Sequence, residues 1–295
     1  MSEVQRHWNH SLMKCLVTGG LGFIGSNLVE KLTELDYNIT IWDNADGPAQ
    51  DLPVVKNVDI SQLSTSQYKS LDREFDIIFH LAALSKIQPS FNNPKRTHDI
   101  NVTGTVEILE VAKKCGAKVV YAGSSSFYYD QYANPYAYTK WIGEECCKLY
   151  NKVYNVPVAI ARFFNVYGPA CVVDGPYSSV VAIFEDQIAN NKSLTITGTG
   201  EQRRDFIHVY DVVNALVAMS EKKWNAKIFN VGYGQNVSIN ELAQMFKPKE
   251  IVSVPARCGE ADVTLAGIDL TKEELNWEPV IAIEQYIEDF INGQV

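Results

Sequence analysis

The sequence lacks the long apolar runs that mark membrane proteins and secreted precursors. No apolar stretch approaches the ~18–20 residues that a helix needs to cross a bilayer, which argues against a membrane-spanning protein. Residues 1–13 are polar and contain no apolar core of the signal-peptide type. We therefore expect a loose leader over residues 1–13, in a protein of the cytoplasm.

Metal-binding and redox patterns are missing as well. The chain has 6 cysteines and 5 histidines, and neither set shows the spacing of a metal or disulfide site. Cys146 and Cys147 are adjacent in an expected helix, and the other cysteines are scattered. We expect reduced cysteines that act as small apolar residues, and no metal site.

The chain also lacks an excess of basic residues. The chain has 26 Lys and Arg against 35 Asp and Glu, a net charge of -9, which argues against a nucleic-acid partner. With 46% hydrophobic and 21% charged residues, the composition is that of a globular protein. Its 295 residues suit one large α/β domain or two modest ones.

Three glycines spaced three apart are the most informative feature that is present. Gly19, Gly22 and Gly25 follow a short apolar stretch and open an amphipathic pattern. Such glycines allow a tight strand-to-helix turn, close approach of a pyrophosphate and close packing of the helix. Asp43 ends the next apolar stretch, near the spacing at which a carboxylate meets a ribose hydroxyl. The pattern predicts a dinucleotide site; the alternative is a tight turn with a surface aspartate.

Apolar stretches alternate with helical patterns through the first two thirds of the chain. Continuous apolar runs separated by helices indicate a parallel sheet that is covered on both faces. We expect a Rossmann-type doubly wound α/β fold. Its expected strands lie at 14–18, 39–42, 54–60, 75–83, 118–122 and 158–162, with a late strand at 228–231, and its expected helices at 24–35, 94–115, 135–151 and 211–220.

The pattern changes after residue 166, where prolines and glycines become frequent and a helical stretch lies near 180–190. We expect residues 14–166 and 205–237 to form the NAD-binding Rossmann domain. Residues 167–204 and 238–295 are expected to form a smaller α+β substrate-binding cap. Because ligands of open α/β sheets bind at the carboxyl ends of the strands, this cap should close over that edge.

A tyrosine and a lysine supply the candidate chemistry. Tyr136 and Lys140 are four apart on one expected helix, so their side chains share a face. A nearby ammonium, together with a cationic nicotinamide, favours the phenolate of a tyrosine whose ordinary pKa is ~10. Ser124 ends the preceding expected strand and offers a hydroxyl to share the proton. The alternative is a Tyr-x-x-x-Lys pair on an exposed helix face.

These motifs resemble those of a known family, the extended short-chain dehydrogenase/reductases. Within it the chain is most similar to the NAD-dependent nucleotide-sugar epimerases and dehydratases, and among these to the UDP-glucose/UDP-N-acetylglucosamine 4-epimerases. The resemblance runs from residue 14 to about residue 279. It is carried by residues 18–25, 80–83, 101–105, 136–140, 162–169, 204–209 and 275–279.

The resemblance implies roles at the matching positions. It implies Ser124, Tyr136 and Lys140 as catalytic residues. It implies a cofactor site for NAD, because Asp43 would repel a 2′-phosphate. The implied cofactor site consists of Gly19, Gly22, Phe23, Ile24, Gly25, Asp43, Asn44, Asp59, Ile60, Leu81, Ala82, Ala83, Tyr136 and Lys140. The implied substrate site consists of Ser85, Ser124, Ser125, Ser126, Asn165, Arg204, Arg257 and Thr264, with the two arginines as a diphosphate clamp.

The residues after Ser124 bear on the type of reaction. The related sugar dehydratases place Asp-Glu there, whereas this chain has Ser125 and Ser126, which disfavours dehydration and, less clearly, decarboxylation. Tyr136 follows Ser124 by only 12 positions, about half the spacing usual in the family, so the loop between them is trimmed. The resemblance places Thr264 where the epimerases vary a residue that controls room for an N-acetyl group, and this small threonine predicts that N-acetylated UDP-sugars are accepted.

The expected function is therefore UDP-hexose 4-epimerisation in a homodimer. The alternatives are a reductase, a dehydratase or a decarboxylase of the same fold, or a catalytically silent NAD-binding regulator. The intact Ser124, Tyr136 and Lys140 argue against a silent protein.

Overall fold

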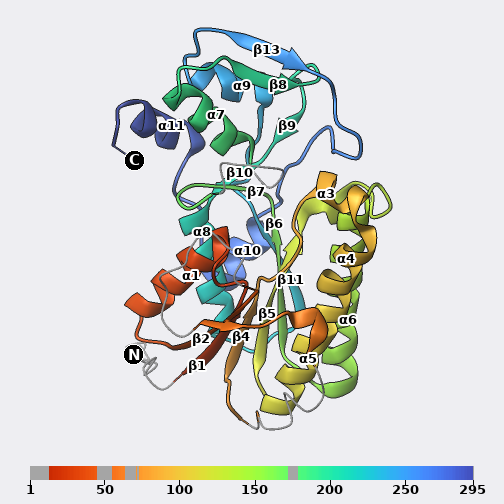
Figure 1. Ribbon diagram of the computed structural model, residues 1–295. Helices are drawn as coiled ribbons and strands as arrows, with labels where there is room; N and C mark the ends of the chain where they lie inside the picture. The colour runs from red at the N-terminus through yellow and green to blue at the C-terminus, as the bar shows by residue number, and fades with distance from the viewer. Residues whose placement is uncertain (1–12, 45–54, 64–70, 72, 172–178, 295) are drawn as a thin grey trace.

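The computed structural model describes residues 13–44, 55–63, 71, 73–171 and 179–294 (Figure 1). The leader expected over residues 1–13 lies outside the described residues except for its last position. No helix in these ranges is long and apolar enough to cross a bilayer.

A parallel sheet forms the centre of the molecule. Its strands run in the order β11-β6-β5-β4-β1-β2-β3, and every neighbouring pair is parallel. The strands are β1 (Lys14–Thr18), β2 (Asn38–Asp43), β3 (Val55–Asn57), β4 (Ile77–His80), β5 (Lys118–Ser124), β6 (Val158–Phe163) and β11 (Asn225–Val231). The expected Rossmann-type fold is confirmed. The direction of winding reverses between β1 and β4, which creates a crevice at their carboxyl ends.

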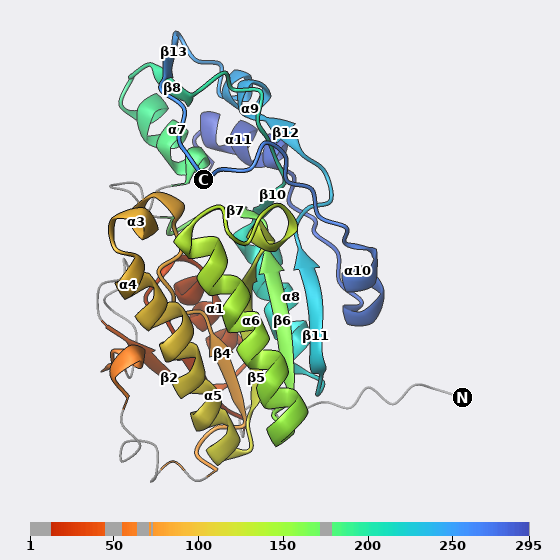
Figure 2. The same ribbon diagram turned by 90° about the vertical axis from the view of Figure 1, so that its right-hand side faces the viewer.

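Helices cover both faces of this sheet. On one face lie α1 (Phe23–Glu34) and α8 (Val209–Ser220), and on the other α4 (Pro94–His98), α5 (Gly104–Cys115) and α6 (Pro135–Tyr154) (Figure 2). Neighbouring strand residues point to opposite faces. In β1, Val17 packs into the cluster under α1 and α8, and Leu16 packs into the cluster under α5 and α6. This alternation explains why the strands are apolar at every position.

The helix expected over 94–115 is present, but its geometry changes along its length. A short helix α3 (Ile87–Asn92) precedes α4, and a wider π-helical turn η3 (Asp99–Thr103) separates α4 from α5. In this turn Asn101 is buried, and its amide is fully used. Asn101 Oδ1 accepts from Leu84 N at 2.8 Å, and its Nδ2 donates to Leu84 O and Thr139 Oγ1, each at 3.0 Å. Asn101 thus joins the segment after β4 to α6.

The remaining elements form a second group with its own core, in the upper part of Figure 1. Phe184, Phe246 and Tyr286 are central to this core. The expected division into two domains stays a prediction. The group contains α7 (Val180–Ala189), α9 (Ile239–Met245), α11 (Ile283–Ile291), the paired strands β8 (Leu194–Thr197) and β13 (Ile251–Val254), and β9 (Arg203–Arg204) with β12 (Val237–Ser238); β7 (Asn165–Tyr167), β10 (Phe206–His208) and α10 (Asp269–Leu275) connect it to the sheet.

Candidate active site

A cavity of about 830 Å³ runs along the carboxyl ends of the sheet strands and reaches residues of α7, β8 and β13. It brings together nearly all the residues expected to form the site. Its lining includes Gly19, Gly22, Phe23, Ile24, Gly25, Asp43, Asn44, Asp59, Ile60, Leu81, Ala82, Ala83, Ser85, Ser124, Ser125, Tyr136, Lys140, Asn165, Arg204, Arg257 and Thr264. Ser126 is not among the lining residues, and its buried hydroxyl has no hydrogen-bond partner in the described part of the chain.

The glycine turn leaves no room for side chains. Gly19 has a φ of 72°, and a Cβ there would lie 2.8 Å from the Ala82 backbone. A Cβ on Gly25 would lie 2.0 Å from Gly19 O, so only glycine lets α1 pack this close. Gly22 is the N-cap of α1, and as a glycine it offers no side chain to accept a hydrogen bond from the N–H groups of the first turn. The N-terminus of α1 therefore fits the pyrophosphate of a dinucleotide.

Asp43 lies where a ribose-binding carboxylate is needed. It ends β2, its side chain is buried, and Asp43 Oδ2 accepts from Leu21 N at 3.0 Å. The carboxylate is thus held against the glycine turn, which fits NAD.

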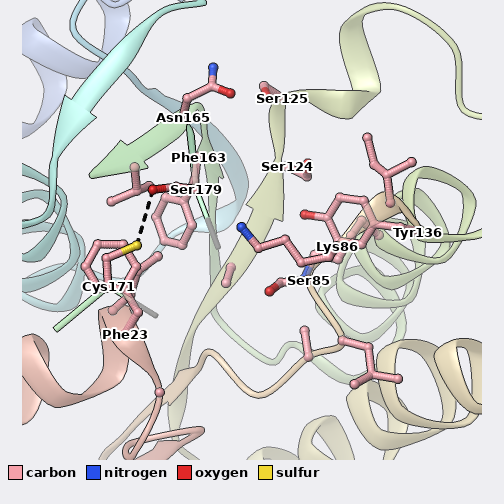
Figure 3. A pocket seen from close by; sticks show the side chains of 18 of the residues that line it. Phe23, Ser85, Lys86, Ser124, Ser125, Tyr136, Phe163, Asn165, Cys171 and Ser179 are labelled. Carbon is pink, nitrogen blue, oxygen red and sulfur yellow. Dashed lines mark hydrogen bonds between the residues drawn. The ribbon is translucent and has the colours of Figure 1, made fainter. Parts of the chain in front are cut away.

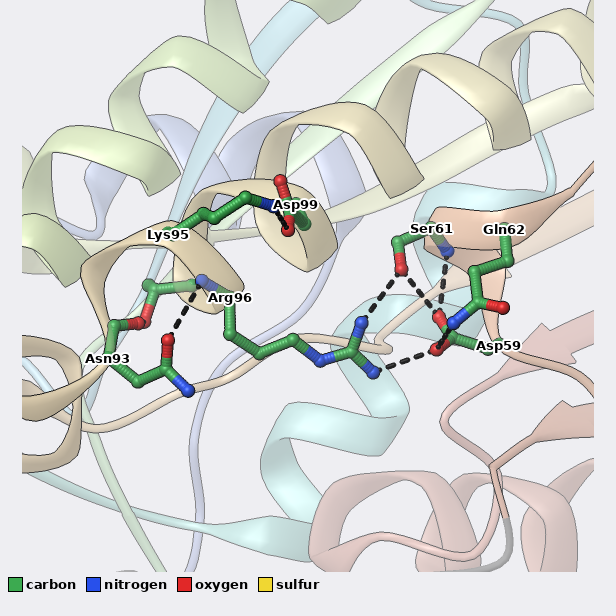
Figure 4. A network of polar contacts seen from close by, with 8 residues as sticks. Asp59, Ser61, Gln62, Asn93, Lys95, Arg96 and Asp99 are labelled. Atoms are coloured by element: carbon green, nitrogen blue, oxygen red, sulfur yellow. Dashed lines mark hydrogen bonds and ion pairs between the residues drawn. The ribbon is translucent and has the colours of Figure 1, made fainter.

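Asp59 and Arg96 of the cavity wall belong to one polar network (Figure 4). Arg96 Nη2 lies 2.7 Å from Asp59 Oδ2, and Arg96 Nη1 donates to Ser61 Oγ at 3.0 Å. Burial raises the pKa of Asp59, but the hydrogen bonds from Ser61 and Arg96 outweigh this and leave the pKa lowered. Asp59 was expected near the adenine. The sequence reasoning missed Arg96, because no local pattern shows that α4 packs beside η2 (Ile60–Gln62).

The candidate catalytic residues come from two neighbouring elements. Ser124 ends β5, while Tyr136 and Lys140 lie on α6, which Asn134 caps by accepting from Ala137 N at 2.8 Å. Figure 3 shows Ser124 and the hydroxyl of Tyr136 at the same side of the pocket. The trimmed connection, which includes η4 (Ser125–Tyr128), therefore still brings Ser124 and Tyr136 into one cavity.

Burial dominates the titration of these groups. It raises the pKa of Tyr136; the Ser124 hydrogen bond lowers that pKa and Glu144 raises it further. Burial lowers the pKa of Lys140 to about 8, although Glu144 acts in the opposite direction. Lys140 Nζ lies 4.6 Å from the centre of the Tyr121 ring. The protein alone therefore raises the pKa of Tyr136, and the expected stabilisation of its phenolate also requires the cationic nicotinamide.

The two expected clamp arginines converge on one carboxylate. Arg204 Nη2 lies 3.7 Å from one oxygen of Glu260, and Arg257 Nη1 lies 3.9 Å from the other. These long contacts leave both guanidinium groups in the cavity wall. Asn165 Nδ2 donates to Thr264 Oγ1 at 3.0 Å, so these two substrate-site residues are also in contact.

A further lysine in the cavity wall was not expected. Lys86 directly follows Ser85 and precedes α3, and Figure 3 shows its amine pointing into the pocket. Its position just beyond the carboxyl end of a buried strand was the signal that could have identified it. In the described ranges, no group of three or more His, Cys, Asp or Glu side chains could hold a metal ion.

Comparisons with known proteins agree with this geometry. The UDP-N-acetyl-alpha-D-glucosaminuronate decarboxylase of Bacillus cytotoxicus is 31% identical, covering 94% of this chain and 96% of the relative. The UDP-glucose 4-epimerase of Mycolicibacterium smegmatis is 32% identical, covering 93% and 96%. The structure of the UDP-glucose 4-epimerase of Thermotoga maritima with UDP-glucose has a TM-score of 0.87, at 29% identity over 95% of this chain and 98% of that one.

The model of one family matches most of the sequence. It is described as the NAD dependent epimerase/dehydratase family, and it matches residues 15–232. That stretch contains the glycine turn, Asp43 and the Ser124, Tyr136 and Lys140 side chains gathered in the cavity. The chain is thus an enzyme of the NAD-dependent epimerase/dehydratase family.

Proposed function

We propose that this enzyme is a nucleotide-sugar 4-epimerase that interconverts UDP-glucose and UDP-galactose and accepts N-acetylated UDP-hexoses. The observation that carries the proposal is the placement of Ser124, Tyr136 and Lys140 in one cavity with the glycine turn and two arginines. The hydroxyls of Ser124 and Tyr136 are suited to removing and returning one proton. The two arginines are suited to binding a diphosphate.

The proposed mechanism assigns one task to each residue. Tyr136 Oη takes the proton of the C4 hydroxyl and later returns it, and Ser124 Oγ shares that proton. Lys140 binds a ribose hydroxyl of the cofactor. When bound, NAD supplies first a hydride acceptor and then a hydride donor, so the reaction is redox-neutral overall. Arg204 and Arg257 hold the diphosphate while the 4-keto sugar rotates in the pocket and presents its other face to the cofactor.

The acids of the cavity wall support epimerisation over dehydration. Among the described lining residues the carboxylates are Asp43, Asp59 and Glu260. Asp59 pairs with Arg96, Glu260 lies between the two clamp arginines, and Asp43 adjoins the glycine turn. Ser125 occupies the wall next to Ser124, and a serine hydroxyl does not act as an acid or base near neutral pH. The proton transfer that expels water in a dehydratase has no suitable group there.

The direct test is a panel of UDP-sugars incubated with the purified, NAD-loaded enzyme and followed by proton NMR. Inversion at C4 of UDP-glucose or UDP-N-acetylglucosamine, with no net loss of NAD, is the expected result. Carbon dioxide release or a dehydrated product would identify one of the alternative reactions. No inversion with any sugar of the panel would contradict the proposal.

We also propose that the enzyme is a homodimer formed through α5 and α6. Leu149 and Val153 are exposed at i and i+4 of α6, where they form an apolar stripe. Sedimentation velocity should give the mass of two chains for the wild type, and that of one chain for the double variant Leu149→Glu/Val153→Glu. A monomeric wild type at micromolar concentration would refute this assembly.

A further inference from the structure

Lys86 differs in its surroundings from the other described cations of the cavity wall. Five cations line the described wall, and four of them have neighbours that offset their charge. Arg96 meets Asp59, Arg204 and Arg257 share Glu260, and Lys140 lies over the Tyr121 ring. The Lys86 ammonium makes no hydrogen bond or ion pair with any described residue. It is partly buried; burial lowers its pKa, and the nearby Cys171 thiol acts in the opposite direction without outweighing it.

The backbone that carries Lys86 is fixed. Asn101 holds both the N–H and the C=O of Leu84, two positions earlier. Two positions later, Gln88 Nε2 donates to Cys258 O at 2.9 Å. A lysine held this way on both sides differs from a surface lysine on a free loop, because its backbone is fixed in the cavity wall.

The phosphates expected in the site already have other partners. The cofactor pyrophosphate is expected at the α1 N-terminus beside Gly22, and the substrate diphosphate at Arg204 and Arg257. Lys86 adjoins Ser85, and its amine points toward the space that Tyr136 also faces (Figure 3). That space is where the reacting sugar lies in the proposed function.

An ammonium in such a wall needs a partner of opposite charge. Removing it from water without a counter-charge is unfavourable, and the hydroxyls of a neutral hexose offer hydrogen bonds but no charge. A carboxylate on the sugar would supply a charge-assisted hydrogen bond, which is about twice as strong as a neutral one.

We propose that Lys86 binds a carboxylate on the sugar, which makes nucleotide hexuronates such as UDP-glucuronate preferred substrates of this enzyme. The inference rests on the proposed function, because it takes the substrate to be a nucleotide sugar. It adds a specificity-determining residue that none of the motifs identified.

The test measures binding, so that it does not depend on turnover. Calorimetric titrations of UDP-glucuronate and UDP-glucose would use NAD-loaded protein in a Tyr136→Phe background, with Lys86→Met, Lys86→Arg and the exposed, pocket-remote control Lys95→Met added. The Kd for UDP-glucuronate should rise about tenfold or more in Lys86→Met, and Lys86→Arg should recover part of the loss. The preference for UDP-glucuronate over UDP-glucose should disappear in Lys86→Met and persist in Lys95→Met.

Three results would overturn the proposal. An equal loss for both sugars would place Lys86 on a group that both ligands share. A weaker Kd for NAD in Lys86→Met, with the preference between the sugars retained, would assign the ammonium to the cofactor. An unchanged Kd for every ligand would leave Lys86 without a binding role. A failure of epimerisation alone would appear in the NMR assay and not in these titrations.

Discussion

Tyr136 and Lys140 share a helix face, yet their surroundings act on them differently. Burial raises the pKa of the tyrosine and lowers that of the lysine to about 8, so each group is biased toward its neutral form. The Ser124 hydroxyl is the nearby group that lowers the pKa of Tyr136. The serine at the end of β5 thus favours the ionised form of Tyr136, as the proton transfer in the proposed mechanism requires.

Removal of the Tyr136 hydroxyl tests its proton-transfer role. Tyr136→Phe should lower kcat for the best substrate by about 10²–10⁴-fold, the contribution of one positioned acid-base group. NAD content, read from absorbance of the denatured protein, should stay close to that of the wild type. Tyr132→Phe is the matched control, since Tyr132 is exposed and does not line the cavity. Equal activity of the two variants would remove Tyr136 from the mechanism.

Thr264 tests the room for an N-acetyl group. Its side chain is buried and accepts hydrogen bonds from Asn165 Nδ2 and Asp205 N at 3.0 and 3.1 Å. Thr264→Tyr should reduce the ratio of UDP-N-acetylglucosamine to UDP-glucose turnover by about tenfold, a difference of about 1.4 kcal/mol in transition-state binding. Thr264→Ser, which keeps the hydroxyl, should leave that ratio near the wild-type value. An unchanged ratio in the tyrosine variant would show that this position does not control access.

At the scale of elements, a buried ion pair fastens α6 to the sheet. Glu144 on α6 meets Arg162 on β6, with Arg162 Nη2 2.7 Å from Glu144 Oε2 and both side chains almost fully buried. The Arg162 guanidinium also lies 3.5 Å from the centre of the Phe127 ring in η4. The pair therefore connects α6, β6 and the segment that follows Ser124.

Neutralising Glu144 should destabilise the fold. Glu144→Gln leaves Arg162 buried without its counter-charge, which costs about 3 kcal/mol or more. The midpoint of urea unfolding should fall accordingly. Glu145→Gln is the control on the same helix, because the exposed Glu145–Lys148 pair contributes at most about 0.5 kcal/mol. A midpoint for Glu144→Gln within error of that control would mean that the buried pair adds nothing.

The sequence predicted the elements whose patterns are local. The glycine turn, the apolar strands and the helix carrying Tyr136 are all present in the structure. The pairing of β8 with β13 was missed, because each strand has four residues and its partner lies far away in the chain. The π-helical turn η3 was also missed; it carries Asn101, whose contacts with Leu84 and Thr139 are tertiary and leave no local pattern.

At the scale of the whole molecule, local sequence patterns indicate some residues of the cavity, whereas others depend on tertiary packing. Residues at or just after strand ends, such as Gly19, Asp43 and Ser124, line one cavity because parallel strands end at one edge, and that arrangement can be inferred from sequence. Arg96 required knowledge that α4 packs beside η2, whereas Lys86 follows the end of β4 in the sequence, a signal that the motifs did not use. The position of Ser126 outside the cavity lining depended on the path of η4, which the sequence does not indicate.

Two buried histidines should make the stability of the whole fold depend on pH. Burial lowers the pKa of His80 to about 3 and that of His208 to about 4, against ~6.5 in an unfolded chain. In the unfolded state these groups bind protons first, so their contribution is complete above pH ~6.5 and is lost as pH falls toward 4. Each histidine should cost up to about 1.4 kcal/mol per pH unit in that window.

Urea unfolding between pH 7.5 and 5 measures this slope. His208→Gln should reduce it relative to the wild type, and His98→Gln, which alters an unburied histidine, should not. Stability that rises as pH falls through this window would contradict the assignment.

The single amide of Asn101 has a consequence for the tolerance of the site. Through it, the segment carrying Ser85 and Lys86 is bonded to the turn η3 and to Thr139 on the helix of Tyr136. A misplacement of 1 Å between a substrate and a catalytic group costs an enzyme about 10²-fold in rate. Asn101 does not line the cavity, yet a change at this one residue would shift the segment of Ser85 and Lys86 relative to Tyr136.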